Sequence, residues 1–558
     1  MEFAELIKVP KLNDVILRRP LCPPTEVVMC ITGHHIILSS RASNDDELWI
    51  LHVMVDSLER RQSNKQNSII IKCKNFQVIQ LDIRGQEDLK CVADSIDWLS
   101  NLDDPRLMYP FYYCRNFDII EDGWQTFDLE REYRKLLKLS NTSHENPNWR
   151  ISNANTDFKL CPTYPEQVIV PRSITDESLV KVANFRCLGR FPVLSYLHKL
   201  NQAVIMRSGQ PMVGPGNKRC KDDERMLTAI IGNQRGHIID TRHENIAQLA
   251  KTKGGGHEPE AYYPLLRRCH KPIPRYHTLI DSLHKLIEGC QDKSSTTEKW
   301  LSTLENSNWL GHVQNVLESA CVVAQCVDHE GASVLVHGSE GMDSTLQVCS
   351  LAQIILDPDC RTVQGFEALI EREWLQAGHP FATRCKHLAF APTNIGNPDK
   401  KEFSPVFLLF MDCVWQIMQQ FACSFEFTED FLILVIDNVY GSEFGTFLAN
   451  CTKERHEFEI PIRTTSLWSY INRPQVLVDC LNPVYEPNEK AIWPSVAAQS
   501  LELWESVYLR WIIDMKFKKK AKQRLKYIRE EQKKLRAEGD QLRMRLAASS
   551  TLPLKASF

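Results

Sequence analysis

The sequence predicts three consecutive parts: a small β-barrel, a large α/β domain and a short coiled coil. Up to about residue 105, short apolar runs alternate with turn residues. From about residue 173 to residue 512, strand-like runs alternate with helical patterns. A heptad pattern begins after residue 515. With 558 residues, the chain is also too long for a single hydrophobic core, so that more than one domain is expected.

The first part, residues 1–105, contains five runs with the apolar composition of β-strands: 27–31, 35–38, 47–51, 68–73 and 76–81. Lys74 and Asn75 separate the last two runs and predict a hairpin. Residues 87–101 predict an amphipathic helix whose apolar face consists of Leu89, Val92, Ile96 and Leu99. Short strands closed by one helix favour a small barrel of the pleckstrin-homology type.

The middle of the chain begins with a stretch rich in aromatic side chains, asparagine and proline, from residue 106 to about residue 172. Such a stretch either wraps a domain surface or forms a loose linker, and we assign residues 106–125 to the linker. Residues 126–512 are expected to form one large α/β domain. Its strand-like runs include 193–196, 203–206 and 237–240, and its helix-like runs include 279–287 and 300–321.

The C-terminal part differs in charge. Residues 516–545 contain 13 lysines and arginines but only 4 acidic residues, a charge of +9, and the rest of the chain carries −12. Any attraction to anions is therefore expected at this tail.

The same tail has apolar residues at two heptad positions, which predict a coiled coil at residues 515–548 and a frayed end at 549–558. A solvated basic helix and a basic helix lying on anionic lipid are the alternatives. Gln532 and Gly539 form two weak layers of the seam. The apolar seam residues are Leu525, Ile528, Leu535, Leu542 and Leu546.

Composition argues against several classes of protein. Hydrophobic residues at 43% and charged residues at 25% are ordinary for a globular chain, and a net charge of −3 does not favour nucleic-acid binding. The start, MEFAELIKVPK, lacks the apolar run of a secretory signal. The segment 407–418 is too short to span a bilayer, and Asp412 interrupts it. We therefore expect a cytoplasmic protein, at most peripheral on a membrane.

Nineteen cysteines raise the question of disulfides or a metal site. They are scattered without a CxxC pair, and the closest two are Cys321 and Cys326. Such spacing favours reduced cysteines that serve as small core side chains. The histidines, including His34 and His35, show no HExxH spacing. We therefore expect neither a metal nor a cofactor.

The most informative stretch is residues 334–353, VLVHGSEGMDSTLQVCSLAQ, in which a strand-like run, a loop of small residues and a helical run follow one another. Such a loop directs several backbone N–H groups and a helix N-terminus at one spot, which favours a phosphate. The loop residues are His337, Gly338, Ser339, Glu340, Gly341, Met342, Asp343, Ser344 and Thr345.

The loop lacks the two groups that phosphatase chemistry needs. Cysteine phosphatases place a thiolate nucleophile at the start of this loop and an arginine six residues later, in the pattern H-C-x5-R. Here Gly338 occupies the cysteine slot and Ser344 the arginine slot. Ser339 is one residue late and lacks an activating base, and Cys349 lies in an apolar helical run. Displaced chemistry through either residue is the least favoured interpretation.

Several stretches together resemble the myotubularin family of phosphoinositide 3-phosphatases, over nearly the whole chain. The family's active loop has the sequence HCSDGWDRT, where this chain has HGSEGMDST. The resemblance is to the catalytically inactive branch of the family. Further family-like stretches are NFRCLGRFPVLS (184–195), MRSGQP (206–211), DTR (240–242) with KGGG (253–256), and GFEALIEREWLQAGHPFATR (365–384).

The resemblance implies an identity for each part. The barrel would be a PH-GRAM domain, the α/β domain a cysteine-phosphatase-like domain without activity, and the tail a dimerising coiled coil. Asp343 corresponds to the general acid of the family. Active members carry asparagines where this chain has Ile246 and Ala250, and a tryptophan where it has Met342. Groups that contact substrate are therefore lost together with the catalytic groups.

The resemblance further implies a function without catalysis. We expect a regulatory subunit that pairs through the coiled coil with an active phosphoinositide 3-phosphatase relative, stabilises it, raises its activity and helps to place it on endomembranes. A homodimer and a weak contact with phosphoinositide membranes also stay open. The alternative is a stand-alone phosphoinositide-binding module, whose lipid binding would depend strongly on salt.

Overall fold

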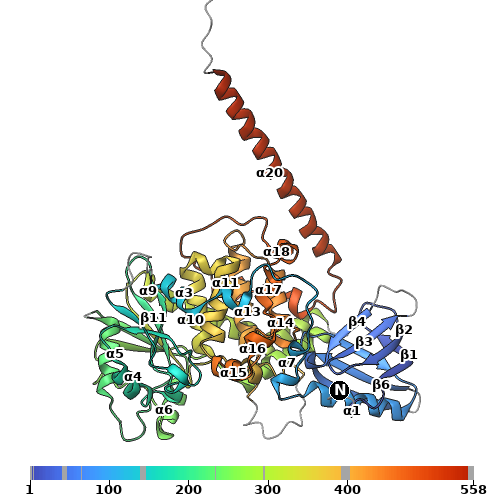
Figure 1. The fold of residues 1–558 in the computed structure, drawn as a ribbon, viewed down its shortest axis with the longest axis horizontal. Coiled ribbons are helices and arrows are strands. Elements are labelled where there is room, and N and C mark those ends of the chain that lie inside the picture. The colour runs from blue at the N-terminus through green and yellow to red at the C-terminus, as the bar shows by residue number, and fades with distance from the viewer. Residues whose placement is uncertain are drawn as a thin grey trace, which may run out of the picture.

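Three parts follow one another along the chain and differ clearly in architecture (Figure 1). This computed structural model describes residues 3, 5–40, 47–63, 66–137, 146–232, 234–292, 296–390 and 402–550. A β-rich N-terminal part, drawn in blue, contacts a large mixed part, and one long helix, α20 (Lys516–Ser550), projects away from both. No described helix is both long enough and apolar enough to cross a membrane.

The N-terminal part is a seven-stranded antiparallel sheet with the strand order β4-β3-β2-β1-β7-β6-β5. Helix α1 (Gln86–Ser100) packs on it with Leu89, Val92, Ile96 and Leu99 in the shared core, as the sequence predicts. The strands are β1 (Lys11–Arg18), β2 (Thr25–Ile31), β3 (His35–Ser40), β4 (Glu47–Leu51), β5 (Val55–Ser63), β6 (Gln66–Cys73) and β7 (Val78–Asp82).

All five predicted strand runs of this part are confirmed, and the predicted hairpin joins β6 to β7. Strands β1 and β5 were not predicted. In β1, Asp14 has a positive φ of 60° and the register shifts between Leu12 and Val15, which interrupts the alternation of apolar residues. In β5, three successive charged residues, 59–61, hide the strand pattern.

The large part is built on a five-stranded sheet with the order β10-β11-β14-β12-β13. β11, β14, β12 and β13 are parallel, and β10 joins one edge antiparallel. The three predicted runs correspond to β10 (Val193–Leu197), β11 (Val204–Ser208) and β12 (Gly236–Asp240), and the other two strands are β13 (Leu266–His270) and β14 (Val334–His337).

Helices cover both faces of this sheet, so that successive strand residues enter different cores. Val334 and Val336 of β14 belong to a core shared with α9 (Trp309–Asp328) and α10 (Ser344–Leu356). Leu335 belongs to the opposite core, with α5 (Lys221–Ile231). Burial on both faces explains why these strands are continuous apolar runs rather than alternating ones. The part is therefore a three-layer α/β domain.

The sequence predicted one helix over residues 300–321, but the structure contains two helices there. Residues 300–321 fall on two helices, α8 (Thr297–Ser307) and α9, because Asn308 between them has a left-handed backbone with φ 56°. The run 279–287 lies within α7 (His277–Gln291), as predicted.

Shorter elements complete the large part. A two-stranded sheet consists of β8 (Trp149–Ser152) and β9 (Val168–Pro171). The remaining helices are α2 (Gly123–Thr126), α3 (Leu129–Leu136), α4 (Asp176–Ala183), α6 (Glu244–Thr252), α11 (Val363–Ile370), α12 (Phe381–Arg384), α13 (Val406–Gln420), α14 (Glu429–Tyr440), α15 (Thr452–Glu457), α16 (Ile460–Arg463), α17 (Leu467–Ile471), α18 (Pro474–Cys480) and α19 (Glu505–Tyr508).

The stretch between α1 and α3 lies along the large part. The Gly123 N–H donates a hydrogen bond to the Ser469 hydroxyl (2.8 Å), and the Trp124 indole donates to the Thr464 carbonyl (3.0 Å). The Phe117 ring lies 5.7 Å from the Tyr470 ring. Of the two possibilities that the sequence left open for this stretch, these contacts fit the one in which it wraps a domain surface.

The N-terminal sheet and the large part are joined by polar contacts that involve backbone groups. The Trp511 indole donates to the Asn75 carbonyl in the β6–β7 turn (2.8 Å). The Asp56 carboxylate accepts the N–H groups of Leu388 (2.9 Å) and Phe390 (2.7 Å). The β6–β7 turn and the Asp56 carboxylate therefore bind two different segments of the chain outside the sheet.

A buried carboxylate, Asp412 on α13, connects distant helices of the large part. It accepts hydrogen bonds from the Trp309 indole (2.8 Å) and from the Tyr508 hydroxyl (2.7 Å). Burial raises the pKa of Asp412, because the apolar surroundings disfavour its charge. The sequence had shown this residue only as an interruption of an apolar run.

We predict that Asp412→Ala lowers the free energy of unfolding by about 2–5 kcal/mol, because the buried donors of Trp309, Tyr508 and Gln416 lose their acceptor. Asp412→Asn keeps an oxygen acceptor of the same shape and should cost much less. Urea unfolding followed by tryptophan fluorescence measures both. Equal losses for the two variants would mean that these hydrogen bonds do not contribute.

Candidate functional site

The predicted phosphate loop lies at the carboxyl end of the central strand. β14 ends at His337 and α10 begins at Ser344, with β11 on one side of β14 and β12 on the other. In a parallel sheet, ligands bind beyond the carboxyl ends of the strands. The sequence expectation of a strand, a tight loop and a helix is confirmed by these elements.

A buried chain of charged groups holds the start of the loop. The His337 Nε2 atom lies 3.1 Å from Glu258 Oε2, and Arg186 binds the other oxygen of Glu258 at 2.7 Å. Arg186 also makes two 2.7 Å hydrogen bonds to Asp223. All four side chains have no exposed surface.

The pKa shifts of Arg186 and Glu258 show how strongly the charges of these four buried side chains depend on one another. Burial opposes the charge of Arg186, but Asp223 and Glu258 outweigh it and raise the pKa of the guanidinium. Burial likewise opposes ionisation of Glu258, yet His337 and Arg186 hold the pKa of this carboxyl well below its usual value. Removing one member would leave an uncompensated charge in the interior.

The cysteine slot, Gly338, is partly filled by a neighbouring side chain. A Cβ atom at Gly338 would lie 2.8 Å from the Thr241 hydroxyl and 3.4 Å from the Ser344 hydroxyl. Those two hydroxyls are themselves hydrogen-bonded to each other at 2.7 Å. The positions of the missing cysteine and the missing arginine are therefore linked through Thr241, and a side chain at residue 338 would press on the Thr241 hydroxyl.

The middle of the loop requires a glycine. Gly341 has a φ of +77°, and a Cβ there would lie 2.2 Å from the Ser208 carbonyl oxygen. Its own carbonyl accepts a 2.8 Å hydrogen bond from Arg190. The loop is thereby held against β11 in the cradle shape.

The backbone of the cradle keeps its donors. Within the part of the chain that the structure describes, no group accepts a hydrogen bond from the backbone N–H groups of residues 339–344. They precede α10, a helix of 13 residues whose N-terminus adds a partial positive charge. The nest that binds phosphate in such loops is thus present without its nucleophile.

The retained acid, Asp343, is an ion-pair partner. Arg384 donates to its two oxygens at 3.0 Å each, and His379 Nδ1 lies 3.3 Å from Oδ1. Burial opposes ionisation of Asp343, but the hydrogen bond from His379 and the charge of Arg384 hold its pKa below the usual carboxyl value. The group is therefore ionised at neutral pH and holds no proton to donate.

Two arginines outside the loop, Arg275 and Arg384, form ion pairs with acidic residues of the loop. Arg275 pairs with Glu340 at 2.7 Å, and the Tyr276 hydroxyl accepts hydrogen bonds from Arg275 (2.6 Å) and from Arg384 (2.8 Å). Tyr276 has a positive φ of 31°, a strained conformation for a bulky residue. Arg275 and Arg384 are thus committed to protein groups, and neither replaces the arginine that is missing at Ser344.

The other candidate nucleophiles have no activating group. Burial raises the pKa of the Cys349 thiol far above its usual value, so that it stays protonated. Among the described residues, no imidazole or carboxylate forms a hydrogen bond with the Ser339 hydroxyl; its carbonyl accepts the N–H of Gln210 at 2.9 Å. The structure therefore adds no support to displaced chemistry.

The three positions that the family resemblance links to substrate contacts lie in the loop or on α6. Ile246 on α6 is 53% exposed, so that an apolar side chain lies on a solvent-facing surface. Ala250 follows one turn later on the same helix, and Met342 is half-buried in the loop. None of the three side chains supplies a hydrogen-bond donor for a head group.

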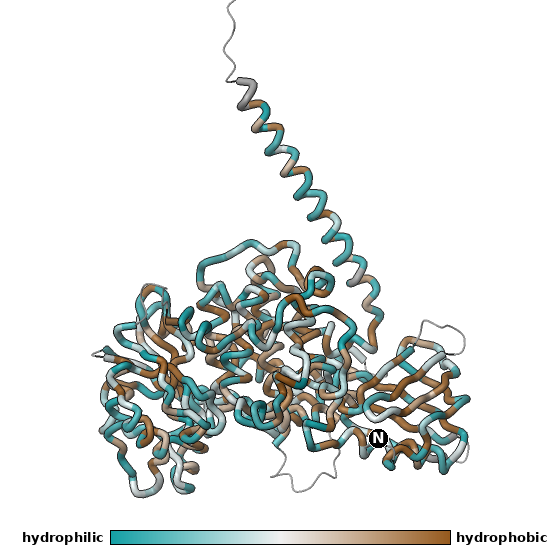
Figure 2. The backbone as a smooth tube through the Cα atoms, viewed as in Figure 1, coloured by the Kyte–Doolittle hydropathy of each residue, from teal (hydrophilic) through white to brown (hydrophobic). Residues whose placement is uncertain are grey.

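The five predicted seam residues lie on α20, away from the loop. Exposed fractions are 44% for Leu525, 49% for Ile528, 65% for Leu535, 58% for Leu542 and 69% for Leu546. Figure 2 shows apolar residues spaced along the projecting helix among hydrophilic ones. Their place on one long helix is confirmed, and their role in partner binding stays a prediction.

The first turns of α20 are bound to the large part by charge. Lys522 lies 2.9 Å from Glu429 and 3.0 Å from Asp430, and Lys526 lies 3.4 Å from Asp479. These pairs direct the helix away from the body (Figure 1). Part of the basic charge that the sequence assigned to anion attraction is therefore used within the chain.

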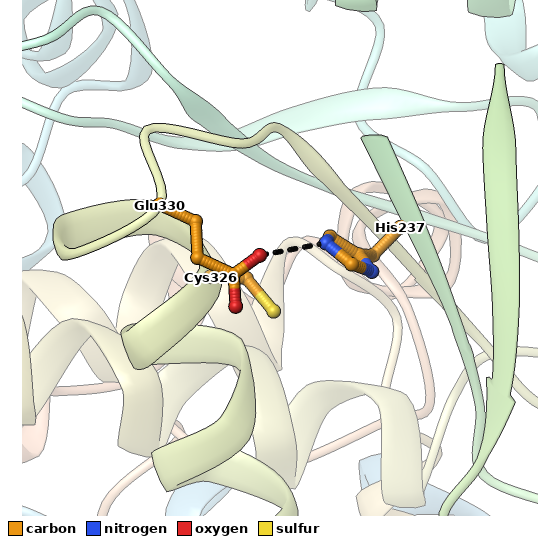
Figure 3. A group of neighbouring side chains, drawn as sticks. All are labelled: His237, Cys326 and Glu330. Atoms are coloured by element: carbon orange, nitrogen blue, oxygen red, sulfur yellow. Dashed lines mark hydrogen bonds and ion pairs between the residues drawn. The ribbon is translucent and has the colours of Figure 1, made fainter. Parts of the chain in front are cut away.

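Three side chains that could ligate a metal meet at the opposite end of the sheet from the loop. His237, Cys326 and Glu330 offer atoms within 4.8 Å of one another (Figure 3). His237 and Glu330 already pair with each other at 3.0 Å, and burial raises the pKa of the Cys326 thiol to about 11. An imidazole–carboxylate pair beside a protonated thiol accounts for this group without a metal ion.

Sequence reasoning found the loop but missed the residues that hold it. Thr241 and Arg384 lay within family-like stretches, so their presence was noted without a role. Glu258 and Tyr276 gave no signal, because a buried carboxylate and a strained tyrosine resemble ordinary loop residues in one sequence.

Comparisons with known proteins agree with this geometry. A family model described as a myotubularin-like phosphatase domain matches residues 108–456, and one described as the MTMR6-9 GRAM domain matches residues 21–100. The chain is 53% identical to Myotubularin-related protein 9 of Bos taurus, over 99% of this chain and 98% of that relative. It is 41% identical to Myotubularin-related protein 9 of Caenorhabditis elegans, over 92% and 91%. It is 35% identical to phosphatidylinositol-3-phosphate phosphatase MTMR7 of Pongo abelii, over 95% and 80%.

We predict that Arg186→Met destabilises the large part by about 3–5 kcal/mol, because Asp223 and Glu258 lose their shared cation in the interior. The matched control is Arg134→Met, which removes an exposed pair with Glu130 and should cost less than about 0.5 kcal/mol. Urea unfolding of both variants tests the difference. A small effect of Arg186→Met would show that the buried chain is not needed to hold the loop.

We also predict that Gly338→Cys lowers stability by about 1–3 kcal/mol through overpacking against Thr241. In a Thr241→Ala background the same substitution should cost at least about 1 kcal/mol less, since neighbouring residues couple. Thermal unfolding of the four proteins in the cycle measures the coupling. Gly216→Cys is the control, because a Cβ there has no atom within 4 Å. Additive effects would contradict the idea that Thr241 blocks the thiol position.

Proposed function

Because this chain belongs to the myotubularin family, we propose that it is a catalytically inactive member that serves as the regulatory subunit of an active phosphoinositide 3-phosphatase of the same family. It pairs with that relative through α20, stabilises it, raises its turnover of lipid and helps to place it on endomembranes. The single observation that carries the proposal is the combination of an intact loop frame with Gly338 and Ser344 in the two reactive slots.

The absence of activity follows from three independent losses. No thiolate stands at residue 338 to form a covalent intermediate. No arginine at residue 344 grips the phosphate, and removal of a comparable clamp typically costs about 10³–10⁵ in rate. The remaining acid, Asp343, is bound by Arg384 and His379 in its ionised form. Restoring any one of these groups alone leaves the other two defects.

The pairing surface is supported by the exposed seam on α20. Apolar side chains on a projecting helix cost solvation free energy unless a second helix covers them. The heptad spacing of Leu525, Ile528, Leu535 and Leu542 matches knobs-into-holes packing between two helices. A helix that is anchored at its first turns and extends from the body presents this seam in a defined direction.

A stand-alone phosphoinositide-binding module is the second candidate, favoured by the basic tail and by the unpaired N–H groups of the loop. Residues 516–545 carry a charge of +9, which attracts anionic lipid over about one Debye length. This candidate requires the isolated chain to bind phosphoinositide vesicles tightly. The lost substrate contacts at Ile246, Ala250 and Met342 count against the loop as the main lipid site.

We predict that Leu535→Glu combined with Leu542→Glu abolishes co-purification with an active relative, because two like charges enter the seam. The control, Ala537→Glu combined with Gln541→Glu, adds the same charge off the seam and should leave co-purification unchanged. Each protein is co-expressed with each active myotubularin of the same species, and turnover of phosphatidylinositol 3-phosphate is measured. The seam variant should return the relative's turnover to its level without a partner.

Two results would reject the regulatory role. In one, the seam variant and the control both co-purify with the relative and stimulate it equally. In the other, no active relative binds the wild-type chain, while the purified chain binds vesicles containing phosphatidylinositol 3-phosphate with strong salt dependence. The second result would make the lipid-binding module the leading account.

A further inference from the structure

A cavity lies where the N-terminal sheet, the stretch that follows α1 and the large part meet. Its volume is about 130 Å³, and residues of all three segments line it. Val53 and Lys74 come from the sheet, Pro105 and Met108 from the connecting stretch, and Tyr440 from α14. The cavity is separate from the loop at residues 337–345, whose residues do not line it.

The first unusual feature of the cavity is a lysine without a partner. Lys74 follows β6 and is only 3% exposed. Within the described residues, its ammonium group forms no ion pair and no hydrogen bond. The nearby carboxylate of Asp56 is committed to the N–H groups of Leu388 and Phe390. Burial of a cation without a counter-ion is costly, so that an anion reaching Lys74 would stabilise its charge.

The charge state of Lys74 is compatible with such a partner. Burial lowers the pKa of Lys74 to about 8, and the attraction of Asp56 only partly offsets this. The amine is therefore still mostly protonated at neutral pH. An anion beside it would raise the pKa back toward the usual value for lysine.

The second unusual feature is the hydroxyl of Tyr440, the last residue of α14. It is buried, and it has no hydrogen-bond partner among the described residues. A buried hydroxyl without a partner is rare and costs about 1–3 kcal/mol. Lys74 and Tyr440 belong to different domains and line the same cavity. Two residues whose side-chain donors have no partner among the described residues thus line the same cavity.

The remaining walls of the cavity are mostly apolar. Phe381, Phe444 and Phe447 line it together with Pro105 and Met108. Its exposed polar rim includes Lys386 and Asp103, which form an ion pair with each other. These two rim charges therefore neutralise each other. A ligand must combine an acceptor group with an apolar body.

We infer that this cavity binds a small organic carboxylate with a short apolar tail, whose two oxygens accept hydrogen bonds from the Lys74 ammonium and the Tyr440 hydroxyl. One cation and one hydroxyl match a monoanion, whereas a phosphate dianion would need more donors than the cavity offers. The tail lies against Phe444 and Phe447. Because the donors come from different domains, the bound ligand strengthens the contact between the N-terminal sheet and the large part.

The test is isothermal titration calorimetry on the full chain with hexanoate, and with hexan-1-ol as the neutral analogue of equal length. Hexanoate should bind at least tenfold more tightly than hexan-1-ol. Lys74→Met should weaken hexanoate binding at least tenfold, and Tyr440→Phe about three- to tenfold. Lys386→Met, which changes a paired lysine at the rim, should alter the affinity less than twofold.

A second measurement does not depend on the variants. Acetylation of Lys74 by acetic anhydride, followed by mass spectrometry, should fall in the presence of hexanoate and not in the presence of hexan-1-ol. Three outcomes overturn the inference: no binding by butanoate, hexanoate or octanoate; equal binding of hexanoate and hexan-1-ol; or unchanged binding by both Lys74→Met and Tyr440→Phe. The proposed regulatory function is unaffected by any of them.

Discussion

The buried guanidinium of Arg186 is the interaction on which the candidate site depends. It holds Asp223 and Glu258, and Glu258 in turn lies 3.1 Å from His337 at the last position of the central strand. Each of these charges is stable in the interior only because the others are present. The start of the loop is therefore held in place by groups that take no part in binding or catalysis. A chain can lose its reactive residues and still need this frame in order to fold.

The residues that shape the middle of the loop are also different from the residues in the two reactive slots. Gly341 and Arg190 hold the cradle against β11, and neither of them needs a substrate. Ser344, in the arginine slot, is hydrogen-bonded to Thr241, whose hydroxyl lies beside Gly338 in the cysteine slot. The two hydroxyls therefore satisfy each other next to both slots. The residues of the site are therefore packed against one another in their present identities.

Surfaces away from the loop then become the places where this chain can act. The projecting helix α20 offers an apolar seam for a second helix, and its basic first turns are bound to acidic residues of the body. The cavity beside Lys74 and Tyr440 joins two domains and has two free donors. The proposed regulatory role would use such surfaces, because regulation of a partner depends on binding.

The sequence by itself determined the order of the three parts, most strands of both sheets, the loop frame and the two missing reactive groups. These features are local: they rest on hydrophobic periodicity, on turn residues and on residue identity at fixed spacing. Only the tertiary structure decided that Thr241 lies against Gly338, that Glu258 supports His337, and that Lys74 and Tyr440 share a cavity. The residues in each of these groups are separated by tens to hundreds of positions, and nothing in a single sequence records which distant side chains become neighbours. Burial also raises the pKa of Asp412, since the pKa depends on surroundings that the whole fold creates.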